Sequence, residues 1–184
     1  MKKGRKQQMN KLLIVVDYQN DFVNGSLGFA GAQALEEAIC EKIQAYQKAG
    51  DDVVCTLDTH GEDYSETQEG RKLPIPHCLR GTQGWLLYGK TAALLKDCRK
   101  FEKPVFGSAE LFEFLRQTPY SSIELCGLVS NICVVSNAVL ARTAQPEAEI
   151  VVDAACTASN DPALNEAVLQ VLAGLQVTVL HHGS

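Results

Sequence analysis

The chain has 184 residues and a formal net charge of −5, so no basic surface predicts a nucleic-acid partner. Its hydrophobic fraction of 46% and its charged fraction of 21% are typical of a globular protein in water. No apolar run approaches the roughly 18 residues that a membrane-spanning helix needs, so we expect no membrane partner.

The length predicts one domain, over residues 11–184, with a core that needs no disulfide or metal to hold it together. The basic segment of residues 1–10 has no apolar centre and is expected to be a flexible, solvated arm. The seven cysteines are odd in number and form no Cys-x-x-Cys pair. Reduced thiols in a cytoplasmic protein therefore fit the sequence better than a disulfide framework.

Short apolar runs alternate with amphipathic stretches along the chain. Runs typical of buried strands cover residues 11–16, 52–57, 99–103, 121–126, 149–152 and 176–180. Apolar residues at helical spacing predict helices over residues 33–49, 91–98, 110–116, 131–140 and 162–173. Residues 59–89 lack periodicity, and so long an insertion in a compact domain is usually functional. The alternation predicts a doubly wound α/β fold, with a mostly parallel six-stranded sheet and helices on both of its faces.

Several polar residues fall where the predicted strands end. In open α/β sheets, ligands bind outside the carboxyl ends of the strands. The residues at or just beyond those ends are Asp17, Asp58, Lys103, Cys133 and Asp153. An acid, a lysine and a cysteine on one edge supply a base, a cation and a nucleophile. Attack of a thiolate on a carbonyl requires these groups.

Cys133 is expected in the first turn of the helix that starts at Asn131. Unpaired backbone N–H groups and the helix dipole favour a thiolate there, and the same N–H groups can hold an oxyanion. Plainer alternatives exist for each residue. A buried cysteine is usually inert, Asp17 can simply cap a turn, and Lys103 can be a solvated edge charge. We expect Asp153 only to cap its turn.

The segment after the second strand contains two histidines. Asp58 and His60 lie two residues apart at a strand end, where alternate side chains share a face, and His77 follows after a loop. Carboxylate and neutral imidazole together suit zinc, iron or manganese. The spacing alone leaves open that these histidines only form hydrogen bonds.

Three motifs together resemble those of a known family. They are IVVDYQNDF, which contains Asp17, FEKPVFGS, which contains Lys103, and GLVSNICV, which contains Cys133. In this order, over residues 12–180, the chain resembles the cysteine-hydrolase branch of the isochorismatase-like superfamily, which includes the nicotinamidases. The resemblance implies that these three residues form a catalytic triad. Isochorismatases proper lack the cysteine, so Cys133 indicates amide hydrolysis through a thioester.

The same resemblance implies further parts of the site. The peptide bond between Leu128 and Val129 is expected to be cis, and the N–H groups of Val129 and Cys133 are expected to form the oxyanion hole. Phe22 matches an aromatic residue that stacks on the substrate ring in the family. Trp85 can line the mouth of the pocket or simply pack, and Tyr64 has the same two alternatives.

A metal site is implied as well. The Asp58, His60 and His77 set is similar to the metal ligands of nicotinamidases, in which the remaining ligand is a histidine or a glutamate. By its distance from His77, Glu69 is the expected fourth ligand, and Glu66 is the alternative. The resemblance implies a divalent ion, zinc before manganese or iron, that orients the substrate ring.

The resemblance predicts a nicotinamidase, which converts nicotinamide and water to nicotinate and ammonia. One alternative keeps the triad but hydrolyses a ureido, carbamoyl or other small amide without a metal. Another alternative is a non-catalytic binding protein on a hydrolase fold. Relatives often form dimers or larger assemblies, so a homo-oligomer is compatible with the sequence.

Overall fold

The computed structural model describes residues 10–182. The basic arm expected at residues 1–10 lies outside the described residues except for Asn10. The proposed division into an arm and one domain over residues 11–184 therefore stays a prediction.

Six parallel strands form one sheet, in the order β3-β2-β1-β4-β5-β6. The strands are β1 (Lys11–Val16), β2 (Asp52–Asp58), β3 (Arg99–Lys103), β4 (Ser122–Leu128), β5 (Glu149–Ala158) and β6 (Thr178–Leu180). Along the chain, β2 and β3 are added on one side of β1, and β4, β5 and β6 are then added on its other side. This is the topology of a doubly wound sheet. The predicted fold class is confirmed.

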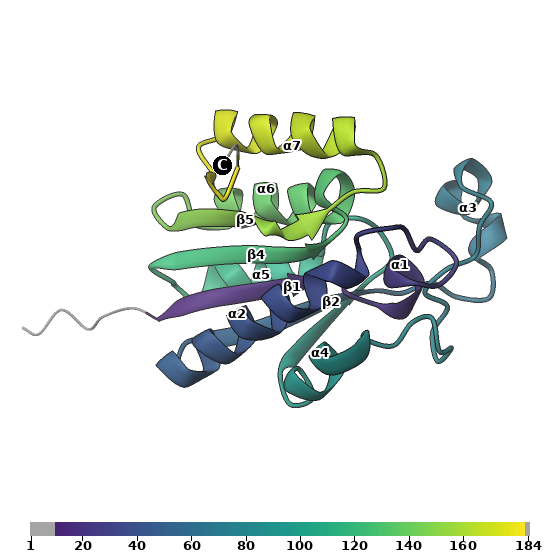
Figure 1. The fold of residues 1–184 in the computed structure, drawn as a ribbon, viewed down its shortest axis with the longest axis horizontal. Helices are drawn as coiled ribbons and strands as arrows, with labels where there is room; N and C mark the ends of the chain where they lie inside the picture. The colour runs from purple at the N-terminus through teal and green to yellow at the C-terminus, as the bar shows by residue number, and fades with distance from the viewer. Residues whose placement is uncertain (1–9, 183–184) are drawn as a thin grey trace, which may run out of the picture.

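Helices cover both faces of this sheet (Figure 1). They are α1 (Asn20–Val23), α2 (Glu36–Ala49), α3 (Gln68–Lys72), α4 (Gly89–Leu94), α5 (Ala109–Gln117), α6 (Val135–Ala144) and α7 (Pro162–Gly174). Shorter turns are η1 (Gln33–Leu35), η2 (Tyr64–Glu66) and the π-helical turn η3 (Ser130–Val134). Within the described residues, no helix is long and apolar enough to cross a membrane.

Alternate residues of β1 enter different cores. Leu13 and Val15 pack with Ile39 and Ile43 of α2, whereas the remaining apolar residues of the strand pack in the core that includes α5, α6 and α7. A strand buried on both faces cannot alternate apolar with polar residues. This explains why β1 is an unbroken apolar run in the sequence.

Local signals fix several helix ends. Gly50 follows α2 with a φ of 77°, a left-handed conformation that glycine adopts without strain. Ser108 caps α5 by accepting the N–H of Leu111. Asp161 accepts two N–H bonds from the first turn of α7, which has Pro162 at its start.

Several element bounds differ from the sequence prediction, and two of the differences affect the region of the strand ends. β5 continues to Ala158 instead of ending at Val152, so Asp153 lies inside a strand and not at its end. The strand resumes its pairing with β4 after a bulge, where Gly127 pairs with Thr157. The segment over residues 59–89 is not structureless, because it contains η2 and α3. Elements this short show too few repeats to be recognised by periodicity.

Candidate active site

Charged side chains from three neighbouring strands meet at one edge of the sheet. Asp17 follows β1, Asp58 ends β2 and Lys103 ends β3. Asp58 pairs directly with Lys103 across the sheet. Cys133 lies in η3, which follows β4, the other neighbour of β1. All four residues are at most 4% exposed.

The Lys103 ammonium is the centre of this group. Its Nζ lies 2.6 Å from Asp17 Oδ2 and 3.2 Å from Asp58 Oδ1. The same atom lies 3.5 Å from Cys133 Sγ. The other oxygen of Asp17 accepts a hydrogen bond of 2.6 Å from Thr56 Oγ1. A cation, two carboxylates and a thiol thus share one buried volume.

Burial sets the protonation of these groups. It raises the pKa of the Cys133 thiol well above its usual value, and Asp17 raises it further. Burial also raises the pKa of Asp17, against the opposing attraction of Lys103. For Lys103, burial lowers the pKa, but Asp17, Cys133 and Asp58 outweigh it and leave the pKa above normal. The resting site therefore holds a neutral thiol beside a charged lysine.

The sequence predicted Cys133 in the first turn of a helix that begins at Asn131. In the structure Cys133 lies in the turn η3, which precedes α6. The N–H of Val134 bonds to the carbonyl of Val129, five residues earlier, at 3.1 Å, and this wider turn delays the start of α6 to Val135. The Leu128–Val129 peptide bond is cis, at the position that the resemblance implies.

A buried amide that the sequence did not single out holds this turn in place. Asn137 Nδ2 donates to the carbonyl of Cys133 at 2.8 Å and to that of Phe106 at 3.1 Å. Its Oδ1 accepts the N–H of Ser108 at 3.0 Å. Asn137 therefore ties the turn that carries the thiol to the loop after β3. A polar residue in a helix gives no signal of such a role.

A second cluster adjoins the first through Asp58. Asp58 Oδ2 lies 3.0 Å from His60 Nε2 and 3.3 Å from His77 Nε2. Two ligands of one tetrahedral zinc ion are separated by about 3.0–3.5 Å, given bonds of about 2.0–2.1 Å. The three ligand atoms lie within 4.8 Å of one another. Two imidazoles and a carboxylate at this spacing fit a divalent metal ion.

Neighbouring groups set the tautomer of His77 and the ionisation of Asp58 in the forms that can bind a metal. His77 Nδ1 lies 2.9 Å from the carbonyl of Ile75, which fixes the proton on Nδ1 and leaves Nε2 free to bind a metal. Burial would raise the pKa of Asp58, but His60, His77 and Lys103 outweigh it and hold that pKa well below its usual range. The carboxylate is therefore ionised, as a metal ligand must be.

Glu69 is the glutamate that reaches this cluster. Its Oε1 lies 3.7 Å from His77 Nε2. Burial and the nearby charge of Asp58 raise the pKa of Glu69. The atoms close enough to hold one metal ion belong to Asp58, His60 and His77, and Glu69 lies next to this group through His77.

Aromatic rings border the histidines. The ring of Phe22 lies 5.6 Å from that of His77, centroid to centroid. Tyr64 lies 4.8 Å from His60 and 5.0 Å from His77, and its hydroxyl donates to the carbonyl of Leu73. Phe22 therefore lies next to the metal-ligand cluster, where the resemblance expects a ring-stacking residue.

A small hollow of about 240 Å³ is lined by residues of α3, of the loop after β3 and of η3. They are Gln68, Glu69, Lys72, Leu73, Val105, Phe106 and Ile132. Glu69 lies 3.7 Å from His77, and Ile132 precedes Cys133 in the chain. The hollow thus adjoins a neighbour of each cluster, and its mostly apolar lining suits a small ligand with few polar groups. Trp85 instead lines a separate hollow beside α4.

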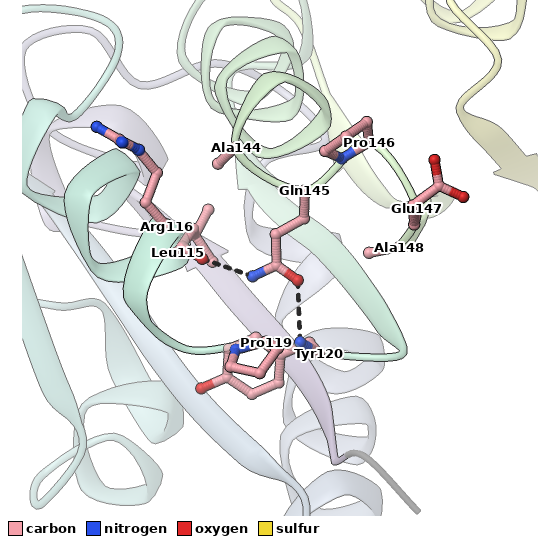
Figure 2. Close-up of a pocket in the computed structure, with 9 residues that line it drawn as sticks. All are labelled: Leu115, Arg116, Pro119, Tyr120, Ala144, Gln145, Pro146, Glu147 and Ala148. Atoms are coloured by element: carbon pink, nitrogen blue, oxygen red, sulfur yellow. Dashed lines mark hydrogen bonds between the residues drawn. The ribbon is translucent and has the colours of Figure 1, made fainter.

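A hollow of about 410 Å³ lies at the opposite edge of the sheet, near the amino ends of β4 and β5 (Figure 2). Gln145 spans it: its Nε2 donates to the carbonyls of Leu115 and Thr118, and its Oε1 accepts the N–H of Tyr120. These bonds join the loops before β4 and β5. We interpret this hollow as a structural junction.

Asp153 does not cap a turn at a strand end, because β5 continues past it. Its carboxylate contacts Lys42 Nζ at 2.8 Å and His181 Nδ1 at 2.8 Å, and it accepts the N–H of Ala155. Asp153 therefore belongs to a separate ionic cluster and not to the site at the strand ends.

Known proteins are similar to this chain in sequence and in fold. A family model described as Isochorismatase domain matches residues 11–183. An uncharacterised isochorismatase family protein, PncA, of Bacillus subtilis is 35% identical over 144 residues, which cover 71% of this chain and 78% of that protein. A nicotinamidase/pyrazinamidase of Mycobacterium tuberculosis is 31% identical over 141 residues, 67% of this chain and 74% of that protein. The crystal structure of nicotinamidase/pyrazinamidase PncA from Bacillus subtilis is similar with a TM-score of 0.84 and 30% identity, covering 94% of this chain and 100% of that one.

Proposed function

This chain belongs to the isochorismatase family, and we propose that it is a cysteine-dependent amidohydrolase that converts nicotinamide and water to nicotinate and ammonia. The observation that carries the proposal is the position of Lys103 Nζ, 2.6 Å from Asp17 and 3.5 Å from Cys133 Sγ. A relative named nicotinamidase/pyrazinamidase, 31% identical to the chain, supports the choice of substrate.

Asp17 acts as the base and Cys133 as the nucleophile. Asp17 takes the thiol proton as the sulfur attacks the amide carbon, and a carboxyl with a raised pKa is suited to accept and return a proton. Lys103 keeps both anions close together. The N–H groups of Val129 and Cys133 hold the developing oxyanion.

The second half of the reaction returns the site to its first state. Protonated Asp17 gives its proton to the leaving nitrogen, the carbon–nitrogen bond breaks, and ammonia leaves a thioester on Cys133. Asp17 then takes a proton from water, which attacks the thioester carbonyl. The carbon–sulfur bond breaks, nicotinate is released, and the proton returns to the sulfur.

Asp58, His60, His77 and Glu69 would hold the metal ion. The donor set favours zinc, with manganese or iron as alternatives. When bound, the ion supplies a coordination site for a ring nitrogen. Phe22, whose ring lies 5.6 Å from His77, stacks on the substrate ring. The hollow of about 240 Å³ that Glu69 and Ile132 help to line is large enough for a small aromatic amide.

All seven cysteines are free thiols, which supports a reducing compartment. We therefore place the reaction in the cytoplasm, where hydrolysis of nicotinamide serves NAD salvage. The alternative of a metal-independent carbamoyl or ureido amidase gives no role to the Asp58, His60 and His77 cluster, and we do not favour it.

Ammonia release from nicotinamide tests this proposal. Purified protein supplied with zinc should release ammonia in an enzyme-coupled assay, and Cys133→Ala should abolish the release. Cys98→Ala is the matched control, because it removes a half-buried thiol just before the amino end of β3, at the opposite edge of the sheet from Cys133. A wild-type protein that releases no ammonia from nicotinamide or pyrazinamide would overturn the substrate, and full activity in Cys133→Ala would overturn the mechanism.

A further inference from the structure

Gln19 is fully buried in the chain segment between Asp17 and Phe22. Its side-chain amide forms three hydrogen bonds. Nε2 donates to the carbonyl of Asp58 at 2.9 Å and to that of Trp85 at 2.7 Å. Oε1 accepts the N–H of Asp58 at 2.8 Å. Both donors of the amide are therefore in use, and its oxygen is paired as well.

Two of these bonds hold the backbone of Asp58, one through its carbonyl and the other through its N–H. β1 pairs with β2 as far as Val16 opposite Thr56. At Asp17 the chain turns, with a φ of 44°, and leaves the sheet. The N–H and carbonyl of Asp58 would then lack a partner on the β1 side. The amide of Gln19 supplies the donor and the acceptor that a further residue of β1 would have supplied.

Asp58, the residue held in this way, belongs both to the group around Lys103 and to the cluster with the histidines. One oxygen of Asp58 contacts Lys103 Nζ at 3.2 Å, and the other lies 3.0 Å from His60 Nε2. A small displacement of the Asp58 backbone would change both contacts together. Fixing that backbone fixes the direction in which the carboxylate faces the lysine and the histidines.

We infer that Gln19 is a positioning residue that holds Asp58 so that one carboxylate serves both the metal-ligand cluster and Lys103. The inference concerns the same site as the proposed function and rests on it for the effect on turnover. Its effect on metal affinity does not depend on which amide the protein hydrolyses.

The chain offers a matched control at the opposite edge of the sheet. Gln145 forms the same kinds of bond: Nε2 donates to two carbonyls, each at 2.7 Å, and Oε1 accepts one N–H at 2.9 Å. Figure 2 shows the bonds to Leu115 and Tyr120. Gln19→Met and Gln145→Met each remove one amide of similar length and similar bonding. Only the first of them removes bonds to a candidate metal ligand.

The test measures zinc affinity by competition with a chromogenic chelator, on the full chain, for wild type, Gln19→Met and Gln145→Met. Melting temperature is recorded alongside. Both variants should melt at a lower temperature than wild type. Gln19→Met should weaken zinc binding by about 10- to 100-fold, the usual effect of losing an outer-shell partner, and Gln145→Met should leave it unchanged.

Equal zinc affinities for wild type and Gln19→Met would overturn the inference, since a merely structural amide lowers only the melting temperature. A wild-type chain that binds no zinc would also overturn it. If Gln19→Met does not fold, Gln19→Asn replaces it, because that side chain keeps the amide but is one methylene too short to reach both groups of Asp58. Failure of the proposed function is distinguishable. In that case nicotinamide releases no ammonia, while the difference in zinc affinity persists.

Discussion

Two lysines, the buried Lys103 and the half-buried Lys42, each contact two buried carboxylates, and only Lys103 lies at the candidate active site. Lys103 Nζ lies 2.6 Å from Asp17 and 3.2 Å from Asp58. Lys42 Nζ, on α2, lies 2.5 Å from Glu124 and 2.8 Å from Asp153. By ion pairs alone the two clusters could not be told apart.

They differ in what else contacts the carboxylates. In the Lys42 cluster, Tyr46 donates to Glu124 at 2.7 Å, and the N–H of Ala155 donates to Asp153 at 2.9 Å. This cluster also has one histidine, the largely exposed His181, and one thiol, Cys156, which lies 3.8 Å from Asp153 Oδ2. In the Lys103 cluster, the thiol lies 3.5 Å from the lysine itself, and two buried histidines share one oxygen of Asp58, an arrangement that can exchange a proton or bind a metal. A buried ion pair marks a site only where reactive groups adjoin it.

Replacement of each lysine by methionine should separate the two clusters most strongly. Lys103→Met should reduce nicotinamide hydrolysis by about 10³-fold, because the charge that holds Asp17 and the Cys133 anion together is lost. Lys42→Met should leave the activity of the folded protein near that of wild type. The measurement is kcat/KM per folded molecule, with the folded fraction taken from circular dichroism. Equal losses in both variants would contradict the distinction.

The stability of the Lys42 cluster gives the next largest effect. Lys42→Met leaves Glu124 and Asp153 buried without their cation, which should lower the free energy of unfolding by about 3 kcal/mol. Urea unfolding at pH 7 measures this value. The matched control is Lys90→Met, which removes an exposed lysine paired with Glu37 and should change stability far less than Lys42→Met does.

Acid should act with opposite sign on one aspartate of each cluster, Asp153 and Asp17. Burial would raise the pKa of Asp153, but Lys42, His181 and the N–H of Ala155 outweigh it and lower that pKa. A lowered pKa stabilises the folded state above the ordinary aspartate pKa of about 3.9. That stability is lost as pH falls toward the folded value. Burial instead raises the pKa of Asp17, so its ionisation at higher pH opposes folding.

The comparison of wild type with Asp153→Asn checks this sign. Unfolding by urea, repeated from pH 5 down to pH 3, should show a smaller loss of stability in Asp153→Asn than in wild type. The effect should be smaller than that of Lys42→Met, since protonation of Asp153 leaves Lys42 paired with Glu124. Identical pH dependence in the two proteins would contradict the assignment.

The smallest change is expected for Tyr46→Phe. It removes one hydrogen bond to the Glu124 carboxylate, which should cost about 1.5 kcal/mol of stability. Activity should not change, because Tyr46 belongs to the Lys42 cluster and not to the candidate active site. Urea unfolding and the ammonia assay on the same preparation test both statements. A loss of turnover would contradict the prediction, because it would mean that the Lys42 cluster affects the candidate active site.

The sequence predicted the sheet and the gathering of residues at the strand ends, because apolar runs locate strands and parallel strands end at one edge. It did not predict the Lys42 cluster. Lys42 lies on an amphipathic helix, and nothing in its spacing distinguishes it from a solvated lysine. The extension of β5 past Asp153 was missed for a similar reason, since its small residues lack a strand pattern and depend on pairing with β4.

The candidate site was predictable where a motif supplied the residues. Asp17, Lys103 and Cys133 each occur in such a motif, and their proximity follows from strand order. Gln19 occurs in a motif too, but its partners are backbone groups of Asp58 and Trp85, which are distant in sequence. Bonds to the backbone leave no trace in the identity of the partner residue. Asn137 was missed for the same reason.

Asp58 has a consequence for redesign of this protein. Because one side chain faces the lysine with one oxygen and the histidines with the other, no substitution at this position can alter one neighbour and spare the other. An engineer who wanted a metal-free variant would first need a new counter-charge for the lysine. A change near the histidines that spares the lysine is available at Glu69, whose partly exposed side chain lies 3.7 Å from His77.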